Sequence, residues 1–412
     1  MPLLASTPLN PPRGWQVFTA APHRMLFLAG VAQTLLVMLV WLVELAGRLW
    51  PGLAVPLSIA PVHAHSFLML FGIFPYFIFG FLFTVYPRWM GSAPIPRRAY
   101  ATAFALLVAG QLLTYLGLYT LRGVLGLAAL LMLAGWGVAL ASLYHVYAGA
   151  RTRGSHERLL NIALAAGALG IIAFVGALVT DSPLWFRAAR ELGLWLFLVP
   201  TLFLVSHRMI PFFSQSVLVD YLMRRPDWAP PLMLVATTAH AAFELSGLPQ
   251  WRWLADVPLA AAALHLSWLW QFRRSFHARL LAMLHIAFLW LGIAMALYSA
   301  QSLLLLVTGA DPLGRAPLHA LGIGFISGMV VAMASRVTLG HSGHALLADQ
   351  LTWLALFGVN VTAVTRVTAE LLPHAYAWLN LLAAAAWLVV FTPWALRYAP
   401  LYLRPRADGE SG

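Results

Sequence analysis

The chain has 412 residues, of which 61% are apolar and only 9% are charged. Soluble globular proteins carry about 25% charged residues, so soluble enzymes, disordered chains and nucleic-acid-binding domains are excluded. The net charge of +12 comes from 25 arginines, which lie mostly in short loops between apolar stretches, where basic residues meet anionic lipid headgroups. The composition therefore predicts an all-α polytopic membrane protein whose partner is the lipid bilayer, with no nucleic-acid partner.

Twelve apolar segments are each long enough to cross a bilayer, which takes about 20 residues. They cover residues 25–46, 64–86, 100–120, 123–147, 159–179, 188–207, 230–248, 254–272, 279–307, 318–339, 350–372 and 375–396. We therefore expect a membrane bundle of twelve transmembrane helices. The expected organisation is an N-terminal tail (1–24), a single membrane domain (25–396) and a C-terminal tail (397–412).

The arginines give this bundle an orientation. Eighteen of the 25 lie in the two tails and in every second loop, and the other seven lie on the opposite face. Cytoplasmic loops of membrane proteins carry the excess of basic residues, so both termini are predicted to be cytoplasmic. Residues 1–22 contain no apolar stretch typical of a signal peptide and are expected to form part of the cytoplasmic tail.

The 14 histidines are the most informative polar residues, because polar groups inside a membrane are costly and tend to face a cavity, a partner or a cofactor. His63 and His65 begin the second segment, and His319 begins the tenth. Both helices run inward, so the three side chains are expected at the same outer depth. Residues 60–64 and 316–320 share the pattern Ala-Pro-apolar-His-Ala. Two such helices could place imidazoles on opposite faces of a porphyrin, or the match could be chance.

Three further patterns leave alternatives open. Met69 follows His65 by one helical turn, and a thioether beside imidazoles is acceptable for copper, although a Met on an apolar segment more often serves packing. His240 and Glu244 share one helical face, as either a proton relay or a satisfied polar pair would require. A G-x-x-x-G pattern beginning at Gly324 allows close approach of a neighbouring helix or of a flat ring.

Four stretches together resemble the NnrS family. They are HAHSFLMLFGIFPYFIFGFLFTVYPRWMG in the second segment, HRMIPFFSQ at 207–215, LHIAFLWLG at 284–292, and LHALGIGFISGMVVAMASRVTLGHSG in the tenth segment. The resemblance implies a twelve-span protein of the bacterial inner membrane that binds haem and copper. It also implies an association with nitric oxide and nitrosative stress in denitrifying and related bacteria.

Carried over residue by residue, His285 falls on the family's histidine in the ninth segment and His341 on the motif that ends the tenth. The second segment departs from the family pattern W-H-A-H-E-M-L-F-G. Aligned without a gap, the first family histidine falls on His65 and the second on Phe67. Keeping the histidine pair as His63 and His65 needs a two-residue insertion, so the choice between these two ligands stays open.

A remoter resemblance is to the main subunit of haem–copper oxidases and nitric oxide reductases. There, a histidine placed like His65 ligates low-spin haem together with a histidine placed like His319. The H-x3-Y and His-His patterns that hold copper in that superfamily are absent from the sixth and seventh segments. This absence argues against reduction of nitric oxide or oxygen at a site of that kind.

These resemblances imply a membrane protein with haem b, with or without copper. It is expected to act on nitric oxide or a related small molecule, either as an oxidoreductase with an unidentified redox partner or as a protective protein. The implied haem ligands are His65 and His319, with His63 as the rival. The candidate copper ligands are His63, His65, Met69, His285 and His341. The arginines available for haem propionates are Arg48, Arg122, Arg252 and Arg315. A proton-coupled secondary transporter and a structural subunit of a respiratory assembly are the alternative functions.

Overall fold

A computed structural model describes residues 14–409 of the chain, and every regular element among them is helical. The first half contains α1 (Trp15–Phe18), α2 (Pro22–Leu49), α3 (Pro61–Gly72), α4 (Phe74–Trp89), α5 (Arg97–Tyr119), α6 (Arg122–Gly149), α7 (Ser155–Thr180), α8 (Pro183–Glu191) and α9 (Val199–Val217). The second half contains α10 (Ala229–Leu245), α11 (Trp253–Leu269), α12 (Arg279–Thr308), α13 (Ala316–His319), α14 (Gly328–His341), α15 (Gln350–Leu371) and α16 (Tyr376–Leu403). Four short 3₁₀ turns are η1 (Pro51–Leu53), η3 (Pro249–Trp251), η4 (Phe272–His277) and η6 (Pro373–Ala375).

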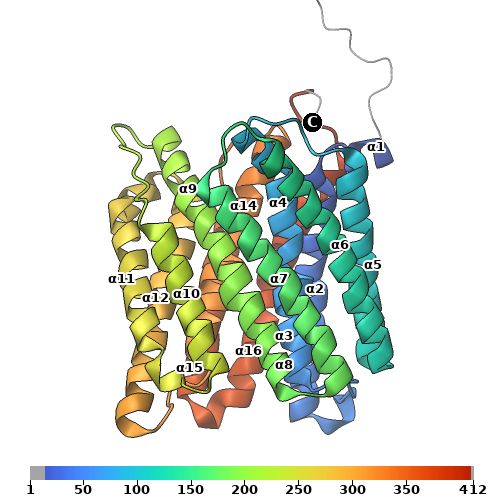
Figure 1. Cartoon of the computed structure of the whole chain (residues 1–412), viewed down its shortest axis with the longest axis vertical. Coiled ribbons are helices and arrows are strands. Elements are labelled where there is room, and N and C mark those ends of the chain that lie inside the picture. Colours follow the sequence, from blue (N-terminus) through green and yellow to red (C-terminus); the bar gives the residue numbers. More distant parts are fainter. Residues whose placement is uncertain (1–13, 410–412) are drawn as a thin grey trace, which may run out of the picture.

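All twelve predicted segments are helical, but they differ in length. Among residues 14–409, ten helices are long and apolar enough to cross a membrane. The remaining two, α10 and α11, have 17 residues each. They run alongside the long helices, and α1 and the C-terminus lie at the same end of the bundle (Figure 1). We call this end the proximal end and the opposite end the distal end.

The helices form because nearly every side chain in them is apolar and each helix satisfies its own backbone hydrogen bonds, as a bilayer requires. Proline occupies the first turn of several of them, where its missing N–H has no partner to lose. Pro61 begins α3 in this way, and Pro75 sits in the first turn of α4, after the chain leaves helical hydrogen bonding at Ile73. The segment from Pro61 to Trp89 is therefore two helices in line.

The most enclosed helices are those that carry the predicted haem ligands. In both Pro61–Trp89 and Ala316–His341, 83% of the most apolar window is buried, against 39% in the peripheral α5, α6, α15 and α16. The peripheral helices expose large apolar side chains such as Leu130 and Leu396, as a lipid-facing surface requires. The candidate site is thus held by the centre of the bundle.

Two long helices contain a π-helical stretch. η2 (Leu192–Leu198) joins α8 to α9, and η5 (Ala320–Ser327) joins α13 to α14. The Ser327 hydroxyl donates to the Gly322 carbonyl, five residues back, at 2.8 Å. π-Helical turns occur mostly as single turns and frequently at functional sites. Here each stretch begins directly after a polar residue of interest, Glu191 or His319.

The G-x-x-x-G pattern serves helix packing. A β-carbon on Gly324 would meet the indole of Trp290 in α12, and one on Gly328 would lie 3.2 Å from the β-carbon of Ala287 in the same helix. The space beside both glycines is therefore filled by α12. This arrangement supports the packing alternative over approach of a flat ring.

Candidate functional site

His65 of α3 and His319 of α13 line one cavity near the distal end of the bundle. They are 254 positions apart in the chain, and the cavity between them has a volume of about 50 Å³. The other walls come from α2, α3, η5, α15 and α16. The polar and aromatic side chains in these walls are Trp41, Thr362, Arg366, Asn380 and Trp387. Met69, one turn after His65, also lines this cavity.

The ring nitrogens of the two histidines are in different states. Nδ1 of His319 donates to the backbone carbonyl of Arg315 at 2.9 Å. This hydrogen bond fixes the tautomer and leaves Nε2 with a free lone pair, the arrangement typical of a metal-ligating histidine. Nδ1 of His65 is buried and has no hydrogen-bond partner among the described residues. An unpaired buried polar atom costs about 1–3 kcal/mol, so this nitrogen points to a missing partner.

An aromatic side chain lies against His65. The indole of Trp41 stacks on the imidazole with ring centroids 3.9 Å apart and planes tilted by 21°. The guanidinium of Arg48 lies over the Trp41 ring, 5.1 Å from its centroid. Trp41 had no distinguishing signal in the sequence, because a tryptophan on an apolar helix is common at membrane interfaces.

Arg366 brings a positive charge into the same cavity. Its Nη2 lies 2.7 Å from the carboxylate of Glu370, but its buried Nη1 has no partner within the described residues. The amide oxygen of Asn380 is likewise buried and unpaired there. Arg366 is not among the arginines that the sequence analysis proposed for haem propionates. The structure places it beside both histidines.

The four arginines proposed for haem propionates differ in their availability. Arg48 lies over Trp41, and the backbone of Arg315 holds His319. Arg122 is instead paired with Asp181 at 2.6 Å, and Arg252 is paired with Glu244. Arg48 and Arg315 are therefore near the His65–His319 cavity, with Arg48 also paired with Glu44 at 3.1 Å, whereas Arg122 and Arg252 have carboxylate partners elsewhere.

His63 faces a different cavity from His65. Its ring stacks on Phe186 of α8 with centroids 3.9 Å apart and planes within 1°. The second cavity has a volume of about 190 Å³ and contains three arginines in its walls, Arg187, Arg190 and Arg315. Side chains two residues apart on a helix point about 200° apart. This geometry separates His63 from His65 and pairs His65 with His319.

The remaining candidate copper ligands are dispersed. His285 is buried in α12 and its Nε2 lies 3.1 Å from the Ser214 hydroxyl. His341 lies beside His23 at the proximal end, with ring centroids 4.7 Å apart and planes tilted by 39°. Within residues 14–409, no group of three or more His, Cys, Asp or Glu side chains has metal-binding geometry. Of the proposed copper ligands, His65 and Met69 line one cavity, whereas His63, His285 and His341 lie elsewhere in the bundle.

A third polar cavity, of about 260 Å³, lies at the distal end between α8, η2, α10 and α12. His240 Nδ1 lies 2.6 Å from Asp256 Oδ1 of α11, and both side chains are at most 1% exposed. Glu244 pairs with Arg252. The sequence analysis considered a pair between His240 and Glu244, but His240 instead pairs with Asp256 in α11, and Glu244 pairs with Arg252, the residue just before α11. We call the six charged or titratable residues here the distal charged cluster. They are Arg190, Glu191, His240, Glu244, Arg252 and Asp256.

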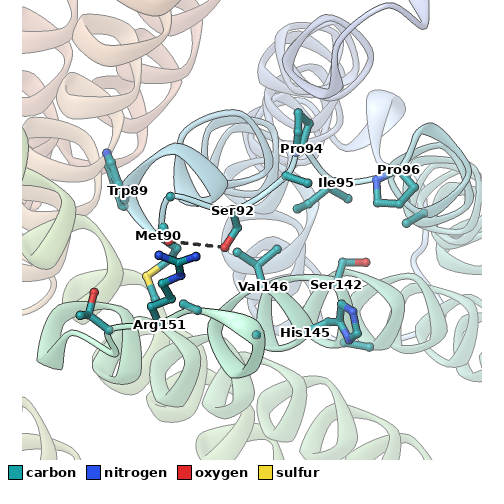
Figure 2. Close-up of a pocket in the computed structure, with 17 residues that line it drawn as sticks. Trp89, Met90, Ser92, Pro94, Ile95, Pro96, Ser142, His145, Val146 and Arg151 are labelled. Atoms are coloured by element: carbon teal, nitrogen blue, oxygen red, sulfur yellow. Dashed lines mark hydrogen bonds between the residues drawn. The ribbon is translucent and has the colours of Figure 1, made fainter.

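The largest cavity, about 1160 Å³, lies at the proximal end between the α4–α5 loop and the end of α6. Figure 2 shows that this opening is lined by small and apolar residues of the loop, with His145 and Arg151 on the α6 side. None of the predicted cofactor or metal ligands lines it. The volume therefore does not mark the predicted site.

A family model described as NnrS protein matches residues 17–406 of the chain. No curated protein matches it. The match covers more than nine-tenths of the 412 residues, and it confirms the resemblance found in the sequence motifs. With ten helices suited to crossing a membrane among the described residues, the chain is a multi-pass membrane protein that belongs to the NnrS family.

Proposed function

We propose that this protein holds haem b between His65 and His319 and acts in nitric oxide metabolism or in protection against nitrosative stress. The observation that supports this proposal is the shared cavity, in which His65 has an unpaired ring nitrogen and His319 has its Nδ1 held by a carbonyl. Both rings stand at the start of enclosed helices that begin with proline. Rigid positions of this kind suit axial ligation.

The donor set fits haem, but the volume of the cavity requires a rearrangement. Two imidazoles supply axial ligands, and the unpaired Nη1 of Arg366 suits a propionate oxygen. The cavity of about 50 Å³ is smaller than the roughly 300–1,000 Å³ typical of pockets for small molecules. The indole of Trp41 is the flat group that now covers His65, so we expect Trp41 to move when a porphyrin binds.

Haem held by His65 and His319 would supply one-electron transfer or binding of nitric oxide. The residues of the chain orient and protect the group. The Arg315 carbonyl fixes the His319 ring, and Met38 and Ile323 contribute apolar side chains to the wall of the cavity. The copper ligands His63, Met69, His285 and His341 remain predictions.

The proposed topology is a single domain over residues 25–396 with twelve crossings and both termini in the cytoplasm of a bacterium. α10 and α11 would supply two of the crossings, since both lie alongside the long helices (Figure 1). The arginine excess in the tails and alternate loops supports this orientation. The distal end then faces outward.

The optical spectrum of the purified protein tests the haem proposal. His65→Ala and His319→Ala should each abolish or shift the Soret band, because each removes one axial ligand. His63→Ala tests the rival ligand on the same helix, and His145→Ala, in the large proximal cavity, is the control. A normal haem spectrum in both His65→Ala and His319→Ala would show that the axial ligands lie elsewhere.

The proton-coupled transporter is the second candidate, and the distal charged cluster favours it, because buried titratable groups at a cavity are typical of such carriers. A wild-type protein without a Soret band, combined with proton flux in liposomes, would select this candidate over the haem protein. Absence of both signals would favour the structural subunit.

A further inference from the structure

The distal charged cluster contains an odd number of charges. Its carboxylates are Glu191, Glu244 and Asp256, and its guanidiniums are Arg190 and Arg252. With His240 neutral, the cluster carries a net charge of −1. The other charged groups at the cavity are Asp311 and Arg315, one of each sign, on exposed loop positions. The excess negative charge therefore belongs to the buried part of the cluster.

The ion pairs leave part of this charge without compensation. Arg190 binds Oε1 of Glu191 at 2.6 Å and lies 3.7 Å from Glu244, which also pairs with Arg252. The positive charges of the two guanidiniums therefore compensate the negative charges of the two glutamates. Among residues 14–409, the side chain of Asp256 hydrogen-bonds only to the imidazole of His240, and the 2.6 Å separation is as short as a charge-assisted hydrogen bond.

Two carboxylate oxygens in the cluster have no donor. Oε2 of Glu191 and Oδ2 of Asp256 are buried without a hydrogen-bond partner in the part of the chain that the structure describes. Glu191 is only 2% exposed and lines the cavity. A buried carboxylate oxygen without a donor is strongly unfavourable. A proton on either carboxyl, or on His240, would neutralise the cluster.

Water can reach these groups from the distal surface. The cavity of about 260 Å³ runs from Glu191 and His240 to the exposed loop residues Asp311 and Gly314. A water needs roughly 10–15 Å³ of such volume, so the cavity has room for many. The His240 ring packs against the indole of Trp195, with centroids 3.6 Å apart, and against Tyr298 at 5.0 Å, and both of these side chains line the same cavity. The cavity therefore connects the buried groups to the distal surface.

The chemistry of the cluster favours a proton over a metal ion. The guanidiniums of Arg190 and Arg252 already occupy carboxylate oxygens that a metal ion would need as ligands, and no metal-binding group of three or more His, Cys, Asp or Glu side chains exists within residues 14–409. A proton needs no coordination shell. It also supplies the hydrogen-bond donor that the unpaired oxygens lack.

We propose that the distal charged cluster is a proton-binding site that takes up one proton from the aqueous phase at the distal end, shared between Glu191 and the His240–Asp256 pair. The proton passes from water in the cavity to the buried groups and returns by the same route. The site is independent of the proposed haem. The helix α8, which carries Glu191, continues into the π-helical stretch η2. Trp195 in η2 stacks on His240.

Infrared spectroscopy of the full-length protein in lipid nanodiscs tests this proposal. Between about pH 8 and pH 5, above the range in which exposed carboxyl groups titrate, the wild type should gain the carbonyl band of a protonated carboxylic acid, shifted in heavy water, and should take up one proton more than a variant that lacks the excess negative charge. Glu191→Gln and Asp256→Asn each remove the excess negative charge, so each should lose this proton. Glu157→Gln is the matched control, because Glu157 is a buried carboxylate paired one-to-one with Arg208; its variant should keep the band.

Two results would overturn the proposal. One is the absence of this titrating carboxylic acid band from the wild-type protein. That measurement does not depend on whether any variant folds. The other is a band and a proton count that stay the same in both Glu191→Gln and Asp256→Asn. Because neither readout involves haem, a protein without a Soret band can still pass this test.

Discussion

Replacement of Gly324 by alanine should destabilise the protein, whereas the same change at Gly322 should not. A β-carbon on Gly324 would lie 2.5 Å from Cγ and 2.7 Å from Cε3 of Trp290, far inside the 3.5–4.0 Å of a normal carbon contact. Trp290 cannot easily give way, because its Nε1 donates to Asn360 Oδ1 at 2.6 Å. A β-carbon on Gly322 meets nothing within 4 Å.

The expected magnitude follows from comparing the two variants. Both gain the roughly 0.5–1 kcal/mol by which alanine favours a helix over glycine, so this contribution cancels. Overpacking of a tight core costs about 1–3 kcal/mol. The free energy of unfolding of Gly324→Ala should therefore be lower than that of Gly322→Ala by about 1–3 kcal/mol.

Unfolding by sodium dodecyl sulfate in mixed micelles measures this difference. Trp290→Phe provides a rescue, because the smaller ring leaves room for the added methyl group. In a double-mutant cycle, Trp290→Phe and Gly324→Ala should couple by about 0.5–3 kcal/mol. If Gly324→Ala and Gly322→Ala are equally stable to within about 0.5 kcal/mol, the packing argument is refuted.

Three further predictions concern the surface and the topology. Asp349 caps α15 by accepting from the Thr352 amide at 2.8 Å, so Asp349→Ala should lower the free energy of unfolding in a detergent titration by about 0.5–2 kcal/mol. Burial acts to raise the pKa of Asp349, but hydrogen bonds from Thr352 and Arg397 lower this pKa overall. The contribution of Asp349 to the stability of the protein is therefore complete above the unfolded pKa of about 4 and is lost as the pH falls below it. Asp349→Asn should remove this pH dependence. Breaking the exposed Arg122–Asp181 pair with Asp181→Asn should change stability by less than about 1 kcal/mol and less at high salt. Reporter fusions at the C-terminus should be active only in the cytoplasm; an active extracellular fusion contradicts the topology.

Much of the fold was predictable because each crossing is a local property of the chain. An apolar run long enough to span a bilayer becomes a helix whatever its neighbours are, and all twelve predicted segments are helical. The shortness of α10 and α11 was not predictable, since proline and glycine near their ends allow several boundaries. The π-helical stretches were also missed, because they keep the apolar composition of an ordinary helix.

The features of the candidate site that depend on the depth of a residue in the membrane were predictable, and those that depend on the rotation of a helix about its axis were not. The order of the helices placed His65 and His319 at the same level, and the structure brings them to one cavity. Which histidine of the second segment faces inward depends on how α3 is rotated against its neighbours, which a motif does not contain. Trp41 and Asp256 were missed for the same reason, since their partners are on other helices.

The hydrogen bonding of the ring nitrogens distinguishes buried histidines such as His207 and His285 from His65. His207 Nε2 lies 3.2 Å from the Pro226 carbonyl, and His285 Nε2 lies 3.1 Å from the Ser214 hydroxyl. These buried rings satisfy a hydrogen bond and so contribute to stability on their own. His65 has no such bond, and its unpaired nitrogen costs about 1–3 kcal/mol. A leucine at this position would pack against Trp41 without that cost, so stability alone gives no reason for a histidine here, and a ligand on its free nitrogen does.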